Sequence, residues 1–244
     1  RWDSNMHELA DRLAQNQAFG RAGELRARGD EAAAIRLLQQ QPASPRRDIT
    51  LADWALERGD ATTALAGYQQ VLQQDASNND AALGRIEALL ALQRTTEARA
   101  ALHSLPDSVA QQSLNSGRRV ALAWQNSGDL LKAQQLFSAL KTRAAAVAPS
   151  QEKALVLRDA ARLERQQRQP ALAQQDYRAA MVASGITPAL PDDNARYTRL
   201  TRTQAQDDWL KRSIRSDAAD LYRQQDTTVT LEQDYSREDR KSVV

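Results

Sequence analysis

The chain has 244 residues, of which 41% are apolar and 26% are charged, a composition that excludes an intrinsically disordered protein. Its 33 basic and 31 acidic residues are interspersed and leave a formal charge of +2, so there is little electrostatic reason to expect nucleic acid as a partner. The absence of cysteine excludes disulfides, thiolate metal sites and cysteine nucleophiles. The sequence starts at Arg1 without an initiator Met or a signal sequence, and we expect a piece of a longer protein.

An internal repeat covers most of the chain. Five segments align without gaps, each with an Ala at its centre and a bulky residue four positions later. The segments are RGDEAAAIRLLQQ from Arg28, RGDATTALAGYQQVL from Arg58, QRTTEARAAL from Gln93, SGDLLKAQQLF from Ser127 and RQPALAQQDY from Arg168. The residues expected to make the packing contacts of the repeat are Ala34, Ala64, Ala98, Ala133, Ala173, Leu38, Tyr68, Leu102, Phe137 and Tyr177.

Each segment predicts a tight turn followed by the second helix of a hairpin. Gly29-Asp30, Gly59-Asp60 and Gly128-Asp129 supply the turn, because Gly tolerates a positive φ after a helix end and Asp caps the next helix. The third and fifth segments have Gln93-Arg94 and Arg168-Gln169 in the same place. The central Ala lets the two helices approach closely, and the bulky residue four positions later lies on the same face.

This pattern resembles the tetratricopeptide repeat, a helical hairpin with a period of about 34 residues. The resemblance implies an all-α fold, a tetratricopeptide-repeat α-solenoid of about five helical hairpins over residues 1–184. Because one hairpin cannot bury its apolar face alone, the hairpins must stack. The longest spacing, between Ala133 and Ala173, predicts longer helices or a longer connection around VAPSQE.

A further helix is predicted beyond the array. Gly185 and two prolines end the last hairpin, and a C-terminal helix follows over residues 194–225, capped by Asp192, Asp193 or Asn194. Its apolar stripe comprises Leu210, Ile214, Ala218 and Leu221, with Trp209 and Tyr222 alongside, and its basic residues are Arg196, Arg199, Arg202, Lys211, Arg212 and Arg215. Residues 226–244 are predicted to be an extended or disordered tail, in which Val229 to Tyr235 alternate as in a β-strand.

The segment DDWLKRSIRSDAADLYRQQDTTVTLEQDY, from Asp207 to Tyr235, resembles one junction in the cellulose synthase operon protein C family of bacterial cellulose secretion. In that family the junction joins a periplasmic repeat array to an outer-membrane β-barrel. The resemblance implies that the tail is the start of a barrel missing from this chain. It also implies a non-catalytic periplasmic scaffold, tethered to the outer membrane, that links an inner-membrane synthase to an outer-membrane pore for export of cellulose, a β-1,4-glucan.

The same resemblance implies partners but no cofactor. Other subunits of the secretion machinery are expected to bind the array, and a glucan chain or peptidoglycan is a further candidate partner. Two alternatives stay open. One is a general peptide-binding assembly or co-chaperone array, and the other is the equivalent scaffold of another exopolysaccharide exporter.

Residues that could carry catalysis are scarce. His7 and His103 lie in different repeats, and the sequence shows no Gly-rich phosphate loop and no metal-spaced cluster of His, Asp or Glu. We therefore predict no enzyme, no catalytic residue and no metal site. Trp54 and Trp124 fall on the first helices of their hairpins, where core packing is favoured over stacking on a sugar.

A concave binding face is expected along the first helix of each hairpin. Counting back from the turns gives the candidates Arg26, Asp53, Glu87, Arg118, Gln125, Asn126, Arg158, Arg162 and Arg165. The last three have helical spacing and project together, so they could meet an acidic peptide, a carboxylate-bearing polymer or another subunit. The alternative is a solvated stripe relieved by Asp159 and Glu164.

Overall fold

The structure is a computed structural model that describes residues 1–186 and 207–224. Within these ranges the secondary structure is helical and contains no strand, and no helix is long and apolar enough to span a bilayer. The chain forms two compact units, Arg1–Pro106 and the part from Asp107 onward. The division between them falls inside the array expected over residues 1–184.

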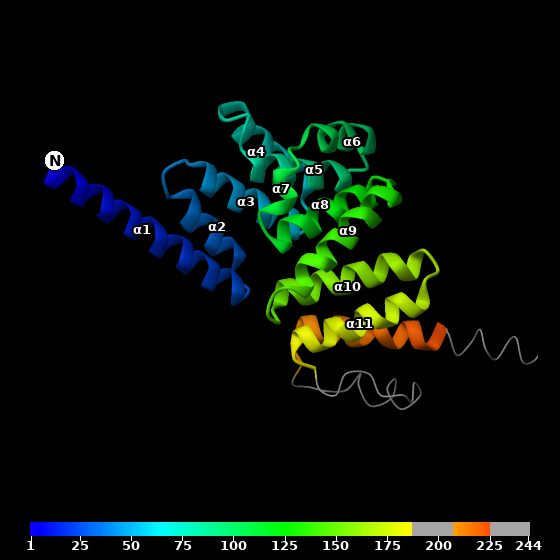
Figure 1. The fold of residues 1–244 in the computed structure, drawn as a ribbon. Coiled ribbons are helices and arrows are strands. Elements are labelled where there is room, and N and C mark those ends of the chain that lie inside the picture. The colour runs from blue at the N-terminus through cyan, green and yellow to red at the C-terminus, as the bar shows by residue number, and fades with distance from the viewer. Residues whose placement is uncertain (187–206, 225–244) are drawn as a thin grey trace, which may run out of the picture. The chain divides into compact units, whose positions relative to one another are not determined.

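The first unit consists of three helical hairpins (Figure 1). Their helices are α1 (Trp2–Ala27), α2 (Glu31–Gln39), α3 (Pro45–Glu57), α4 (Ala61–Gln74), α5 (Asn79–Ala91) and α6 (Thr95–Ser104). Contacts run between the members of each hairpin and onward from α2 to α3 and from α4 to α5. The hairpins therefore stack in chain order, as the repeat requires.

The second unit continues the pattern with two hairpins, preceded by a short helix and followed by a C-terminal helix. Its helices are α7 (Ser108–Gln111), α8 (Leu114–Asn126), α9 (Leu130–Ala145), α10 (Gln151–Gln166), α11 (Pro170–Ser184) and a C-terminal helix over residues 209–224. Both α9 and α10 have 16 residues, so lengthened helices account for the long spacing between the last two repeats. The C-terminal helix, orange in Figure 1, lies beside α11.

The five hairpin turns share one hydrogen-bond pattern, although their sequences differ. In the first turn Gly29 N–H donates to Arg26 O at 2.9 Å and Asp30 N–H donates to Leu25 O at 2.9 Å. Gln93 N–H and Arg168 N–H make the bond that corresponds to the first of these, and both residues adopt a φ of 62°, in the left-handed region. The turn geometry thus persists where Gly is absent, at a cost in backbone strain.

The caps of the second helices differ in the same two turns. The side chains of Asp30, Asp60 and Asp129 accept hydrogen bonds from the backbone N–H three residues later, at 3.0 to 3.2 Å. Arg94 and Gln169 make no such bond. These two hairpins therefore lack both the Gly and the cap that stabilise the others.

The predicted packing residues lie in the core. The five Ala residues are fully buried, and their bulky partners are 0 to 3% exposed. Tyr68 fills the space above Gly84, where a Cβ would lie only 2.3 Å from its ring. Its hydroxyl donates to Asp53 on α3. Small residues and large rings therefore interlock between neighbouring hairpins.

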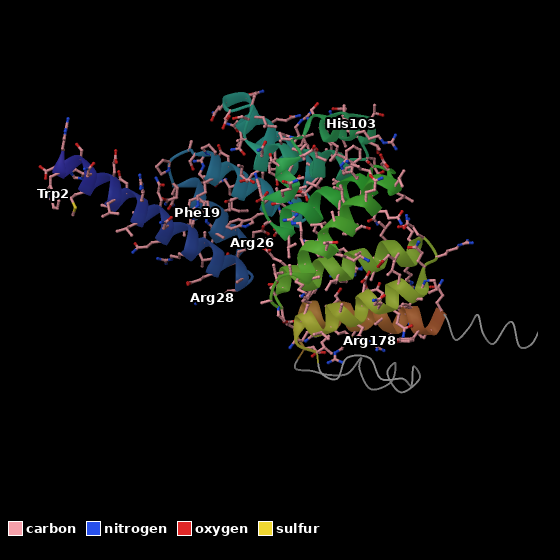
Figure 2. All side chains as sticks on the ribbon, in the orientation of Figure 1. Trp2, Phe19, Arg26, Arg28, His103 and Arg178 are labelled. Carbon is pink, nitrogen blue, oxygen red and sulfur yellow. The ribbon has the colours of Figure 1, made fainter. Side chains whose placement is uncertain are left out.

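Helix α1 is the longest described helix, with 26 residues. Its second half packs on α2 through Phe19, Ala22 and Leu25. Its first half carries a row of exposed apolar side chains, in which Trp2 is 76% exposed. Figure 2 shows Trp2 at the outer end of α1, with Phe19 and Arg26 further along.

The C-terminal helix buries the stripe predicted for it. Leu210, Ile214, Ala218, Leu221 and Tyr222 belong to one core cluster with residues of α10 and α11. By contrast, Trp209 is 65% exposed, because it lies beside the stripe on the solvent side. The caps expected at residues 192–194, the arginines Arg196, Arg199 and Arg202, and the strand expected at residues 229–235 lie outside the described residues.

Candidate interaction surface

The arginine face of α10 is covered by the C-terminal helix of the same chain. Arg158 is only 6% exposed, and its guanidinium donates to Ser213 Oγ at 2.9 Å. The same group lies 5.3 Å from the ring centroid of Trp209, within range of a cation–π interaction. Arg158 also donates to Asp159 at 3.0 Å. This arginine is therefore a packing residue in the structure.

Arg162 forms an ion pair with Asp217 of the C-terminal helix. Its Nε and Nη2 donate to the two carboxylate oxygens of Asp217 at 2.5 and 3.1 Å, a bidentate arrangement. The Tyr177 hydroxyl donates to Asp217 at 3.2 Å. Burial raises the pKa of Tyr177, and the neighbouring Asp217 raises it further, so the hydroxyl stays protonated as a donor. Asp217 thus meets Arg162 where a ligand carboxylate was expected.

The contacts continue to the end of α10. Arg165 Nε donates to Gln224 Oε1 at 3.1 Å, and Gln174 on α11 donates to the Tyr222 hydroxyl at 2.8 Å. Three arginines spaced along α10 therefore contact the C-terminal helix at three points along its length. The expected projection of Arg158, Arg162 and Arg165 from one face is seen, and their nearest partners come from the chain itself.

An open depression lies where this contact ends. It has a volume of about 430 Å³ and is lined by Arg162, Arg165, Gln166, Arg168, Tyr177, Asp217 and Gln224. We call it the basic depression. Three arginines and one carboxylate give its lining a charge of +2. Arg165, in the last turn of α10, and Arg168, in the strained turn that follows, both line it.

The other candidates of the predicted face make contacts within their own units. In the first unit Arg26 donates to Glu57 and stacks on Trp54 at 5.2 Å, while Asp53 accepts from Tyr68. Glu87 lies on α5, half-buried. The face in this unit is therefore already occupied by internal ion pairs and hydrogen bonds.

In the second unit Arg118 donates to Asp159 at 3.0 Å and to Asn115 at 2.7 Å. Gln125 contacts Gln166 at 3.5 Å, and Asn126 is exposed at the end of α8. Neighbouring hairpins are therefore joined by these polar side chains. Whether any of them also contacts a partner stays a prediction.

A buried cluster of one lysine and two carboxylates was missed from the sequence. Lys141 Nζ donates to Glu164 at 3.2 Å and to Asp176 at 2.9 Å, joining α9, α10 and α11. Burial and the neighbouring Asp176 together raise the pKa of Glu164 to about 8. Glu164 accepts from Lys141. Of the two acids expected to relieve the charge of the arginine stripe, only Asp159 contacts those arginines within the described ranges.

The tryptophans divide by position. Trp54 and Trp124 are buried, as expected for first helices of the repeat, whereas Trp209 is exposed. His7 and His103 are exposed on α1 and α6. In the part of the chain that the structure describes, no three His, Asp or Glu residues lie close enough to hold a metal ion.

Comparison with known proteins identifies the repeat. The family model "Tetratricopeptide repeat" matches residues 55–114. The chain is similar to TTC0263, a thermophilic tetratricopeptide-repeat protein of Thermus thermophilus, with a TM-score of 0.58 and 18% identity over 70% of this chain and 92% of that one. It is also similar to pilF of Pseudomonas aeruginosa, with a TM-score of 0.54 and 17% identity over 94% and 99% of the two chains. The predicted tetratricopeptide-repeat α-solenoid is confirmed.

Comparison of sequences gives a more specific match than the comparison of folds. The chain is 52% identical over 234 residues to "Putative cellulose synthase operon protein C" of Escherichia coli O157:H7 and 50% identical over 234 residues to "Cellulose synthase operon protein C" of Salmonella typhimurium. Each match covers 96% of this chain and 20% of the relative, so the chain spans about a fifth of their length. The resemblance predicted from residues 207–235 is confirmed, and it extends over almost the entire chain.

Proposed function

We propose that this tetratricopeptide-repeat chain, a relative of cellulose synthase operon protein C, is part of a non-catalytic periplasmic scaffold for cellulose export. In this role it links the inner-membrane synthase to an outer-membrane pore through contacts with other proteins. The proposal draws on the 50 to 52% identity to these relatives and on the helical repeat, a fold that presents extended surfaces to partners.

The observation that carries the proposal is the attachment of the C-terminal helix. Arg158, Arg162 and Arg165 hold it at three points along its length, through Ser213, Asp217 and Gln224. An array that ends in a firmly docked helix gives a fixed direction to the chain that follows it. A scaffold between two membranes needs such a rigid end, whereas a general peptide-binding array does not.

The test separates secretion from synthesis in cells that carry the gene. Deleting the full-length gene should abolish secreted cellulose, measured by dye binding, while isolated inner membranes continue to make β-glucan from the sugar nucleotide. Loss of synthesis in those membranes would contradict a purely structural role. Secretion of a different polysaccharide would favour the alternative exporter, and normal secretion would favour a general assembly array.

A pair of charge reversals tests the docked helix itself. Asp217→Arg places a cation against Arg162 and should release the helix, which lowers secretion at unchanged protein level. Asp220→Arg makes the same charge change on the same helix, at a residue that forms an ion pair with Arg223 of that helix. Equal secretion by the two variants would argue that docking of this helix is dispensable for export.

Direct contact with the glucan is a second candidate, favoured by Trp209. Its ring is 65% exposed, so one face of it is accessible for stacking on a sugar, whereas Trp54 and Trp124 are buried. Cello-oligosaccharides should then change the tryptophan fluorescence of the chain but not that of the Trp209→Phe variant. Unchanged fluorescence in the parent chain would remove this candidate.

A further inference from the structure

We propose that the basic depression binds neighbouring carboxylates of an acidic peptide segment on a partner protein. The proposal deepens the scaffold function above, because it gives one partner surface of the scaffold a position and a chemistry. It rests on four features of the depression: its charge, the placement of its arginines, the character of its lining and its shape.

The charge of the depression is not neutralised by its own carboxylate. Asp217 already accepts two hydrogen bonds from Arg162 and one from Tyr177. Within the described residues, neither Arg165 nor Arg168 forms an ion pair, and the one hydrogen bond of the Arg165 guanidinium goes to the neutral amide of Gln224. Two guanidinium groups therefore remain available to an incoming anion.

The backbone places these two arginines together. Arg165 is in the last turn of α10 and Arg168 is in the turn that follows, where its N–H donates to Arg165 O at 3.1 Å. Arg168 keeps a left-handed φ of 62°, which is unfavourable for a residue with a side chain. Two planar guanidinium groups held three residues apart suit two adjacent carboxylates, since each can bind one in bidentate fashion.

The remaining lining favours a peptide over other anions. Gln166 presents an amide group, which can donate to the carbonyl groups of a peptide backbone. The Tyr177 ring is fully buried, so the depression offers no aromatic face on which a sugar or a base could stack. Its volume of about 430 Å³ accommodates acidic side chains with part of their backbone, and its open side lets a chain pass.

The experiment uses the purified 244-residue chain and a fluorescein-labelled hexaglutamate peptide, followed by fluorescence anisotropy. A hexaglutamine peptide with the same label is the neutral probe. We expect hexaglutamate to bind and hexaglutamine not to bind. The double variant Arg165→Gln/Arg168→Gln should weaken hexaglutamate binding at least tenfold, and Arg168→Gln alone should weaken it about three- to fivefold.

The matched control removes the same charge elsewhere on the same unit. Arg178 on α11, labelled in Figure 2, and Arg212 on the C-terminal helix are exposed and do not line the depression. The variant Arg178→Gln/Arg212→Gln should bind hexaglutamate like the parent chain. Thermal melting of each variant verifies that it is folded. If loss of the Arg165–Gln224 contact unfolds the double variant, the single variant Arg168→Gln provides the test of binding.

Several outcomes would overturn the proposal. These are no binding of hexaglutamate, an equal loss in the two double variants, or displacement of the peptide by inorganic phosphate with an affinity equal to that of hexaglutamate. The last result would show a simple anion site. The peptide-binding proposal and the scaffold proposal can be refuted independently. Peptide binding is measured on the isolated chain, whereas secretion is measured in cells that lack the gene.

Discussion

Replacing Gly84 by Ala tests the interlocking of small and large residues between α4 and α5. A Cβ at Gly84 would lie 2.3 Å from Tyr68 Cε1 and 2.4 Å from Cζ, whereas ordinary contact begins at 3.4 Å. The ring would have to retreat by about 1 Å. The ring is fully buried and its hydroxyl donates to Asp53, so moving it would disturb that hydrogen bond and the surrounding core.

The expected net effect follows from two opposing contributions. Gly to Ala within a helix stabilises by about 1 kcal/mol. Overpacking a close-packed core costs about 1–3 kcal/mol, and a displacement of a whole ring belongs at the upper end. Gly84→Ala should therefore lower the free energy of unfolding by about 2 kcal/mol. Gly23→Ala on α1 is the matched control, because a Cβ there meets nothing within 4 Å.

The assay is urea denaturation followed by far-UV circular dichroism, with amide hydrogen exchange to locate the change. Gly23→Ala should raise the urea midpoint, Gly84→Ala should lower it, and the extra exchange should be confined to α3, α4 and α5. A midpoint for Gly84→Ala equal to or above that of Gly23→Ala would refute the argument. It would mean that Tyr68 can move aside.

Three further outcomes follow from the turns and from the buried cluster. Gln93→Gly should raise the free energy of unfolding by about 1 kcal/mol in urea denaturation, because Gly adopts a left-handed φ without strain. Arg168→Gly should give a similar gain but weaken hexaglutamate binding, since the side chain is lost, and unaltered binding would contradict its assigned role. The folded state raises the pKa of Glu164 from 4.5 to about 8, so it holds a proton between these values that the unfolded chain releases, and stability should fall as pH rises through this window. Glu164→Gln should reduce this loss of stability with rising pH, measured as melting temperature from about pH 5 to about pH 8. If the variant loses as much stability as the parent chain, groups other than Glu164 cause the loss.

The array was predictable because its determinants are local. A Gly-Asp pair, an Ala and a bulky residue four positions later specify a turn and the face of one helix. Gln93 and Arg168 show the limit of this reasoning, since they occupy the same turn geometry without the residue that favours it. There the packing of the flanking helices imposes the left-handed backbone conformation. This packing cannot be predicted from the four residues of the turn.

The partner of the arginine face could not be predicted for a related reason. Helical spacing places Arg158, Arg162 and Arg165 on one side of α10, but Asp217 lies 55 residues from Arg162 in the sequence. The apolar stripe of the C-terminal helix predicts that it packs somewhere and does not say on which surface. The cluster of Lys141, Glu164 and Asp176 is harder still, because its members come from three helices and share no spacing.

The docked C-terminal helix also has a mechanical consequence. Its contacts with α10 are distributed along its length, from Ser213 through Asp217 to Gln224. A pull along the helix axis loads all of them at once, in shear, whereas a pull across the axis opens them one after another, beginning at Gln224. The end of the array should therefore withstand tension in one direction and yield in the other.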